Sequence, residues 1–200
     1  MKKQVIAAAV FCTLLSSAAI AQQAKEGPWM VRARAVHLDS ANGDTTGLGL
    51  SVNNKTIPEV DITYFFNKNV AAELVLTVPQ KHTVHSTALA SDIGTLRHLP
   101  PTLTVQYHFD GLPVTPYVGA GINYTRFSSV NLAGGAATID KNSFGAALQA
   151  GVDIPLGKNL YLNVDVKKVY IRTDVTLAGV NKGTFKVDPV LVGVGLGWRF

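Results

Sequence analysis

Cysteine is nearly absent from this chain of 200 residues. The single cysteine, Cys12, lies in a short apolar stretch near the amino terminus, after a phenylalanine that is too large for a lipoprotein cleavage site. If that stretch is removed from the mature protein, no disulfide and no thiolate metal site can form. We therefore predict neither a metal centre nor a cofactor.

Long apolar runs are also lacking. After residue 21 no stretch approaches the ~18 consecutive apolar residues that a membrane-spanning helix needs. Charge of one sign is not concentrated either. The chain has 18 basic and 13 acidic residues, and the basic ones form no run. This balance predicts no nucleic-acid partner. The apolar residues, 47% of the chain, must therefore be spread over short segments.

The amino terminus has the three parts of a secretory signal peptide. Lys2 and Lys3 form a basic start, residues 5–15 are apolar, and Ala19-Ile20-Ala21 is an A-x-A cleavage site. A membrane anchor is the alternative, but the apolar run is too short for one. We predict a signal peptide at residues 1–21 and a single exported domain at residues 22–200.

Alternation with a period of two runs through the remaining sequence, most clearly at its end. In residues 190–200 every second residue is apolar, and the residues between them are mostly glycine. Such a period places successive side chains on opposite faces of a β-strand. A soluble sheet buries its apolar face under a second layer, whereas a membrane barrel turns it toward lipid. The ending Trp198-Arg199-Phe200 is typical of bacterial outer-membrane barrels, and it predicts recognition of this strand by the barrel assembly machinery.

Seven other segments alternate in the same way. They are residues 29–39, 57–66, 70–78, 102–109, 115–127, 142–154 and 160–172. In the last of them the phase slips at Lys167-Lys168, which we interpret as a β-bulge. Aromatic residues are predicted to form two girdles at the membrane interfaces: Trp29, Phe66, Phe109, Trp198 and Phe200 at the periplasmic one, and Tyr124, Phe127 and Phe144 at the outer one.

The connections between these segments alternate between long and short. The long ones are residues 40–56, 79–101, 130–141 and 173–186, and the short ones are 67–69, 110–114 and 155–159. Outer-membrane barrels have long external loops, tight periplasmic turns and an even number of strands. A Greek-key sandwich has no reason to show this rhythm. We therefore predict an all-β fold, an eight-stranded antiparallel up-and-down transmembrane β-barrel in the bacterial outer membrane.

Eight parts of the sequence carry a resemblance to a known family: residues 27–32, 62–65, 99–103, 106–109, 116–124, 151–153, 188–189 and Phe200. Together they resemble the OmpW family, and residues 116–124 are the most similar part. The resemblance implies an eight-stranded barrel of a Gram-negative outer membrane, associated with the passage of small hydrophobic compounds. Residues 131–138 match nothing in the family, so no role of the loops is carried over.

Charged residues occupy the inward face of the predicted strands. An eight-stranded barrel is about wide enough for its own side chains to fill. Charges inside such a wall persist mainly when they are paired, so we predict an ion-pair network. This polar plug consists of Arg32, Arg34, Glu59, Asp61, Glu73, Asp153, Asp165, Lys167 and Arg199. A structural role is favoured over a proton or ion pathway, and an open porin is disfavoured.

Four inward residues near the outer ends of the strands are apolar instead: Val36, Leu38, Val75 and Leu191. They predict a hydrophobic cup above the plug, since ligand sites are mostly apolar clefts. We predict passive diffusion of small hydrophobic molecules from this cup sideways into the membrane, because the plug blocks the way down. Ordinary packing explains four apolar residues equally well.

Two other classes of function stay open. A structural or loop-mediated binding barrel is the main alternative, and Lys168, Arg172, Lys182 and Lys186 suit the phosphates of lipopolysaccharide, the expected partner beside membrane lipid. An enzyme is disfavoured, because a Ser/His/Asp set can be assembled from almost any polar loop. We interpret the candidate set of His82, His85, Ser86, Asp92 and His98 as loop polarity.

Overall fold

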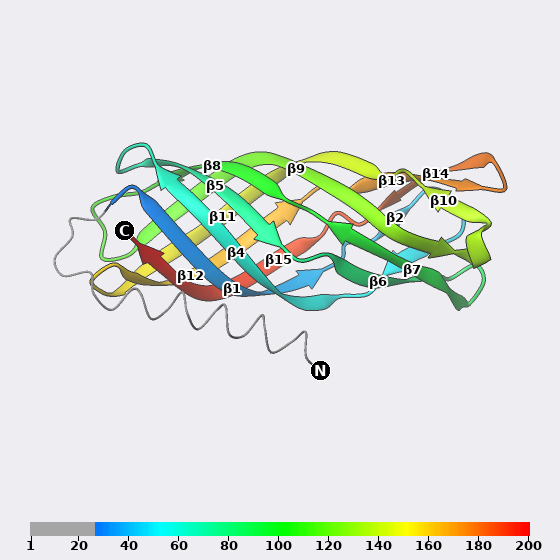
Figure 1. Cartoon of the computed structure of the whole chain (residues 1–200), viewed down its shortest axis with the longest axis horizontal. Coiled ribbons are helices and arrows are strands. Elements are labelled where there is room, and N and C mark those ends of the chain that lie inside the picture. Colours follow the sequence, from blue (N-terminus) through cyan, green and yellow to red (C-terminus); the bar gives the residue numbers. More distant parts are fainter. Residues whose placement is uncertain (1–26) are drawn as a thin grey trace.

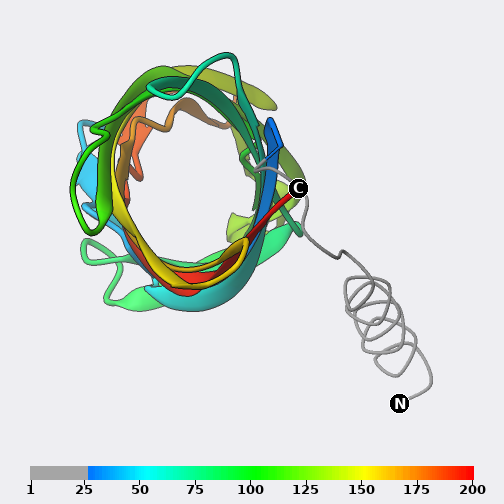
Figure 2. The ribbon, with the colours of Figure 1, turned by 90° about the vertical axis from the view of Figure 1, so that its left-hand side faces the viewer.

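The computed structural model describes residues 27–200, and the predicted signal peptide lies outside them. The described chain is an elongated tube of antiparallel strands (Figure 1). Viewed along its length, the strands form a ring (Figure 2). The described residues include no helix long and apolar enough to cross a membrane.

Eight strands make the closed wall. They are β1 (Trp29–Asp39), β4 (Lys55–Phe65), β5 (Val70–Thr77), β8 (Thr102–His108), β9 (Thr115–Leu132), β11 (Asn142–Gly157), β12 (Leu160–Val169) and β15 (Val190–Arg199). Each pairs antiparallel with the next in this order. The predicted eight-stranded up-and-down barrel is confirmed.

The first and last strands close the ring. β1 and β15 pair from Met30↔Arg199 to Asp39↔Val190. The seam ends in two backbone hydrogen bonds, from Trp29 N to Phe200 O at 3.1 Å and from Phe200 N to Trp29 O at 2.8 Å. Closure satisfies the backbone groups that an edge strand would leave unpaired.

Short turns mark one end of the barrel, which we call the periplasmic end. They are residues 66–69, 109–114 and 158–159, and Phe200 lies at the same end. The opposite end is called the outer end. Along the wall, side chains alternate between exposed outward positions, which are mostly apolar, and buried inward ones, many of which are polar or charged. The exposed ones include Leu74, Leu103, Val105, Ile122 and Leu148, which gives the wall an apolar outer face.

The prediction of long external loops is wrong. The four segments instead fold into strands that continue the tube beyond the eight-stranded wall (Figure 1). These strands are β2 (Gly43–Asp44), β3 (Leu50–Val52), β6 (Gln80–Ser86), β7 (Ser91–Leu99), β10 (Ala137–Ile139), β13 (Arg172–Leu177) and β14 (Val180–Lys186). A 3₁₀ turn, η2 (Ala133–Gly135), precedes β10. We call this part the outer extension.

The predicted bulge at Lys167-Lys168 is also wrong. β12 pairs without a break with β15 up to Lys168↔Val190 and with β11 up to Val169↔Ala147. Lys167, Val169 and Ile171 are all buried and keep one inward phase. The inward residues change here from charged (Lys167) to apolar (Val169 and Ile171). In the sequence this change looks as if the apolar face had switched sides, which is what a bulge would produce.

Aromatic side chains cluster at both ends of the outward face. At the periplasmic end Tyr64 makes edge contacts with Trp29 at 4.7 Å and Phe66 at 5.2 Å between ring centroids. Near the other interface Tyr124 lies 4.8 Å from Phe144. Phe127 does not join this girdle. In β9 up to Phe127, odd-numbered residues face inward and even-numbered ones face outward, so Phe127 is turned inward and buried.

Candidate functional site

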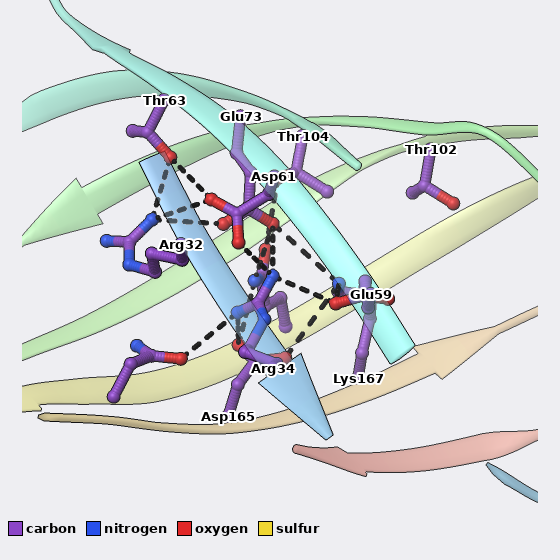
Figure 3. A network of polar contacts seen from close by, with 12 residues as sticks. Arg32, Arg34, Glu59, Asp61, Thr63, Glu73, Thr102, Thr104, Asp165 and Lys167 are labelled. Atoms are coloured by element: carbon purple, nitrogen blue, oxygen red, sulfur yellow. Dashed lines mark hydrogen bonds and ion pairs between the residues drawn. The ribbon is translucent and has the colours of Figure 1, made fainter. Parts of the chain in front are cut away.

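The interior of the tube has three levels. A small apolar cluster of Met30, Phe65, Ala71 and Tyr161 lies at the periplasmic end. Above it the inward side chains are charged and hydrogen-bonded (Figure 3). Above these, the outer extension and the upper wall enclose a larger apolar cluster that includes Val36, Leu38 and Leu191.

Arg32 ties four wall strands together in the polar level. Its guanidinium lies 2.7 Å from Asp153, 3.1 Å from Asp61 and 3.3 Å from Glu73. It also donates to the hydroxyl of Thr63 at 2.7 Å. The side chain is fully buried. One cation from β1 therefore contacts carboxylates on β4, β5 and β11 across the lumen.

Arg34 and Lys167 continue the network toward the outer end (Figure 3). Arg34 lies 2.7 Å from Asp61 and 3.0 Å from Glu59. The ammonium of Lys167 lies 3.5 Å from Glu59, 3.7 Å from Glu73 and 3.8 Å from Asp165. Eight of the nine predicted plug residues thus meet in one buried cluster.

The ninth, Arg199, lies apart at the periplasmic end. Its guanidinium sits over the ring of Phe65 at 3.9 Å and donates to the carbonyl of Gly27 at 3.0 Å. It helps to line a cavity of about 380 Å³ that opens at this end, together with Met30, His108, Asp153 and Tyr161. Because Arg199 lies at the end of β15, it is closer to the periplasmic end than the cluster to which the sequence analysis assigned it.

Neutral polar side chains complete the network, and sequence reasoning missed them. Five carboxylates face three cations in the cluster, so the surplus acids need other donors. Gln149 donates to Glu73 at 2.9 Å and to Asp165 at 2.8 Å. Further bonds to the acids come from Gln106, Tyr117 and Asn163. Their inward parity on the strands is the signal that would have found them.

The four residues predicted to form the cup all lie inside the upper barrel. Val36, Leu38, Val75 and Leu191 are buried, with at most 8% of the side chain exposed. Leu38, Val75 and Leu191 border a cavity of about 20 Å³, which is room for a single water-sized group. Lys167 and Glu59 border the same cavity from below. The cup is thus closely packed, and the polar plug forms its floor.

Two histidines predicted as loop polarity lie inside the outer extension instead. His82 on β6 and His98 on β7 are both buried, and their rings stack 4.7 Å apart at an angle of 15°. His98 also borders the small cavity of the cup. Because β6 and β7 continue the tube wall, their inward residues face the interior rather than water.

The other members of the candidate Ser/His/Asp set do not assemble with these histidines. The hydroxyl of Ser86 is buried and donates to the carbonyl of Leu48 at 2.7 Å. His85 pairs with Asp92 at 2.9 Å on the exposed side of the hairpin. Within residues 27–200 no group of three or more His, Cys, Asp and Glu is placed to hold a metal ion.

The basic residues near the outer end are partly engaged by the protein itself. Arg172 lies 3.2 Å from Asp188, and Lys168 donates to the carbonyl oxygen of Asp188. Lys182 is exposed at the tip of the extension, and Lys186 is half-buried.

The hydrogen-bond ladder of the wall is interrupted beside the cup. Pairing of β5 with β8 ends at Val75↔Thr102, and pairing of β6 with β7 begins at Gln80↔His98. Between them, residues 76–79 and 99–101 form no ladder pair with each other in the described chain. Three of these seven residues are prolines, which have no N–H to donate.

This interruption lies at the upper edge of the outward apolar band. Leu76 and Val78 face outward with exposed side chains on one side of it. Thr77 and Pro100, on opposite sides, both border the cavity of the cup. The interior apolar level and the outward apolar face therefore approach each other here.

Comparisons with known proteins agree with this architecture. The model of the OmpW family matches residues 24–200. Outer membrane protein W of Escherichia coli is 35% identical over 213 aligned positions that cover both chains in full. The uncharacterized outer-membrane protein y4mB of Sinorhizobium fredii is 40% identical over 184 positions, 86% of this chain and 80% of the relative.

A solved structure shows the same fold. The crystal structure of the outer membrane protein OprG from Pseudomonas aeruginosa superposes with a TM-score of 0.75 at 26% sequence identity. The match covers 88% of this chain and 97% of that one.

Proposed function

Because the chain belongs to the OmpW family and is a barrel of the bacterial outer membrane, we propose that it facilitates passive diffusion of small hydrophobic molecules. In this proposal a molecule enters the cup from the outer end, above the lipopolysaccharide layer. It leaves sideways through the interrupted wall into the membrane. The proposal assigns the chain no enzymatic activity.

The division of the interior into an apolar and a charged level carries this proposal. An apolar molecule in the cup meets the buried ion pairs of Arg34 and Lys167 as its floor. Passing them would break contacts whose single loss costs about 3–5 kcal/mol when the charges are buried. The wall beside the cup lacks ladder bonds between residues 76–79 and 99–101, so parting it costs fewer hydrogen bonds than parting any paired segment.

Uptake of an apolar tracer into outer-membrane vesicles tests the proposal. Vesicles from cells with the protein should take up the tracer faster than vesicles without it. Leu38→Asp and Leu191→Asp should each reduce uptake severalfold, because they place a charge in the apolar cup. Leu112→Asp, in an exposed periplasmic turn, is the matched control and should leave uptake unchanged.

Two outcomes contradict different parts of the proposal. Equal uptake with and without the protein would remove transport and favour a structural or loop-mediated binding barrel. Unchanged uptake in both cup variants, with folded protein present, would remove the route through the cup.

A further inference from the structure

The buried histidine pair His82 and His98 has unsatisfied ring nitrogens beside the cup. Both nitrogens of His98 and the Nε2 atom of His82 are buried without a hydrogen-bond partner. His98 is 1% exposed and borders the apolar cavity. A buried polar group without a partner costs about 1–3 kcal/mol, so a native structure keeps one for a reason.

The stacked arrangement shows what these nitrogens can offer. The Nδ1 atom of His82 lies 3.1 Å from the carbonyl oxygen of Asn53, and a carbonyl only accepts. Nδ1 therefore carries the proton of the neutral ring, and Nε2 presents a lone pair. A neutral His98 ring presents one N–H and one lone pair. The pair thus offers both a donor and acceptors.

The two rings are neutral at pH 7. They lie beyond the lipid-facing band, because their neighbours Lys81, Arg97 and Arg126 point outward and are exposed. Burial, the neighbouring His82 and the Lys55 ammonium lower the pKa of His98 to about 3. Burial likewise lowers the pKa of His82, with Lys55 acting in the same direction against the Asn53 carbonyl.

We propose that His98, with His82 stacked on it, is a hydrogen-bonding subsite for the hydroxyl group of a neutral, otherwise apolar molecule such as an alkylphenol. A hydroxyl both donates and accepts, which matches what the neutral rings present. The cavity of about 20 Å³ beside His98 has room for one such group. The apolar remainder of the molecule needs more room than this cavity has, so it must displace side chains of the closely packed cup and replace their apolar contacts with its own.

An anionic ligand fits this cavity less well. A carboxylate only accepts hydrogen bonds and would bring a charge into an apolar space. The cation nearest the cavity, Lys167, already lies within 4 Å of three carboxylates. The floor of the cup therefore carries an excess of negative charge, which opposes an anion. This inference rests on the proposed function and names its preferred substrate class.

A matched pair of probes separates the hydroxyl contribution from apolar binding. The probes are 4-ethylphenol and ethylbenzene, which differ by one hydroxyl group. With ¹⁵N-histidine-labelled protein in lipid nanodiscs, 4-ethylphenol should shift the ring nitrogen resonances of His98 in a saturable manner. Ethylbenzene should leave them in place, and the exposed His37 and the half-exposed His85 serve as internal controls. No saturable shift with 4-ethylphenol, or the same shift with both probes, would overturn the inference.

Uptake into outer-membrane vesicles provides the second readout. Vesicles with the wild-type protein should take up 4-ethylphenol about fivefold faster than ethylbenzene, once uptake by protein-free vesicles is subtracted. This is the ratio that one hydrogen bond of ordinary net strength, about 1 kcal/mol, gives. In His98→Leu the ratio should fall to about one, and His98→Gln, which retains a donor and an acceptor, should restore part of it. Heat-modifiable mobility on gels checks that each variant is folded.

The two hypotheses fail in different ways. If the protein accelerates both probes equally and His98→Leu changes nothing, the subsite is wrong and transport stands. If vesicles with and without the protein do not differ for either probe, the proposed function itself is wrong, while the resonance shift still reports on the subsite.

Discussion

At the scale of residues, the polar plug is a set of buried charges held by several partners each. Arg34 is fully buried and lies within 4 Å of Glu59, Asp61, Glu73 and Asp165. A buried ion is tolerated only where its partners and hydrogen bonds offset the loss of water. The consequence is that single substitutions in the plug should be far more costly than those in exposed pairs.

Arg34→Met tests this cost. Removing the cation leaves neighbouring carboxylates buried with less compensation, so the free energy of unfolding should fall by about 3–5 kcal/mol. Urea unfolding in lipid vesicles measures it. Arg172→Met is the control, because Arg172 is exposed beside Asp188 and its loss should cost at most about 1 kcal/mol. Equal losses in the two variants would contradict a stabilising plug.

The buried histidines predict a loss of stability in acid. In the folded protein the pKa of His98 is lowered to about 3, whereas an unfolded histidine titrates near pH 6.5. The unfolded chain therefore binds the proton first, so stability is lost as the pH falls from about 6.5 toward about 3. Lys55 and His82 are the charged and titratable groups that act on this ring.

His98→Leu should remove that contribution. Its melting temperature should fall less than that of the wild type between about pH 7 and about pH 5, a range above most carboxyl titrations. His85→Gln, which changes a half-exposed histidine on the same hairpin, should keep the wild-type dependence. Identical pH profiles of His98→Leu and the wild type would count against a neutral buried His98.

At the scale of elements, glycines fix how closely neighbouring strands approach. A Cβ atom at Gly195 of β15 would lie 2.0 Å from the carbonyl oxygen of Ala33 on β1. One at Gly121 of β9 would lie 1.9 Å from the carbonyl oxygen of Leu103 on β8. Glycines within strands often mark such close backbone approaches. Two seams of the wall therefore depend on the absence of a side chain.

Gly195→Ala should weaken the seam that closes the barrel. The strands must separate locally to admit the methyl group, which we expect to cost about 1–3 kcal/mol of unfolding free energy. Gly157→Ala is the matched control, since a Cβ there meets nothing within 4 Å. The fraction of heat-modifiable barrel on gels reports the effect. A Gly195→Ala protein as stable as the control would show that the seam adjusts without cost.

The sequence predicted the wall much better than the outer extension. Alternation identifies a strand when one face is lipid-facing and the other polar, as at Leu74 and Glu73 of β5. In β6 and β7 the outward face is polar and the inward face mixes His82 with Val84. This pattern resembles that of a polar loop, so neither the strands nor the histidine pair could be recognised from the sequence alone.

The polar cluster shows the same limit in a different form. Its charged members were predicted because charge on an inward face is unusual. Gln149 and Asn163 were not, since their inward parity was the only signal they gave, and an amide, unlike a charge, is not unusual enough to single out. Arg199 has the right parity but lies one level too low, because parity fixes the face of a strand and not the height of a side chain.

At the scale of the whole molecule, the apolar cup and the interrupted wall lie side by side. Thr77 and Pro100 border both the cavity and the interruption. A lateral route at this place requires the wall to part between β5 and β8, whereas the seam between β12 and β15 keeps its ladder from Leu160↔Trp198 to Lys168↔Val190.

Linking this seam should stop uptake. In a cysteine-free background, Thr77→Cys and Pro100→Cys joined by a short reducible thiol cross-linker should lower tracer uptake severalfold, and reduction should restore it. Val166→Cys with Val192→Cys, a paired position in the closed seam between β12 and β15, is the matched control. Undiminished uptake after complete linkage of the first pair would contradict lateral exit.

The length of β9 has a consequence for where a molecule first meets the protein. The strand has 18 residues and pairs with the wall below and with β7 and β10 above. At about 3.3 Å per residue and a tilt near 40°, it rises roughly 45 Å, against an apolar belt about 25 Å tall in barrels of this class. The remaining height of roughly 20 Å raises the rim of the tube above the apolar belt by more than the thickness of the headgroup layer. A water-insoluble compound can thus touch protein before it reaches the most highly charged layer of the cell surface.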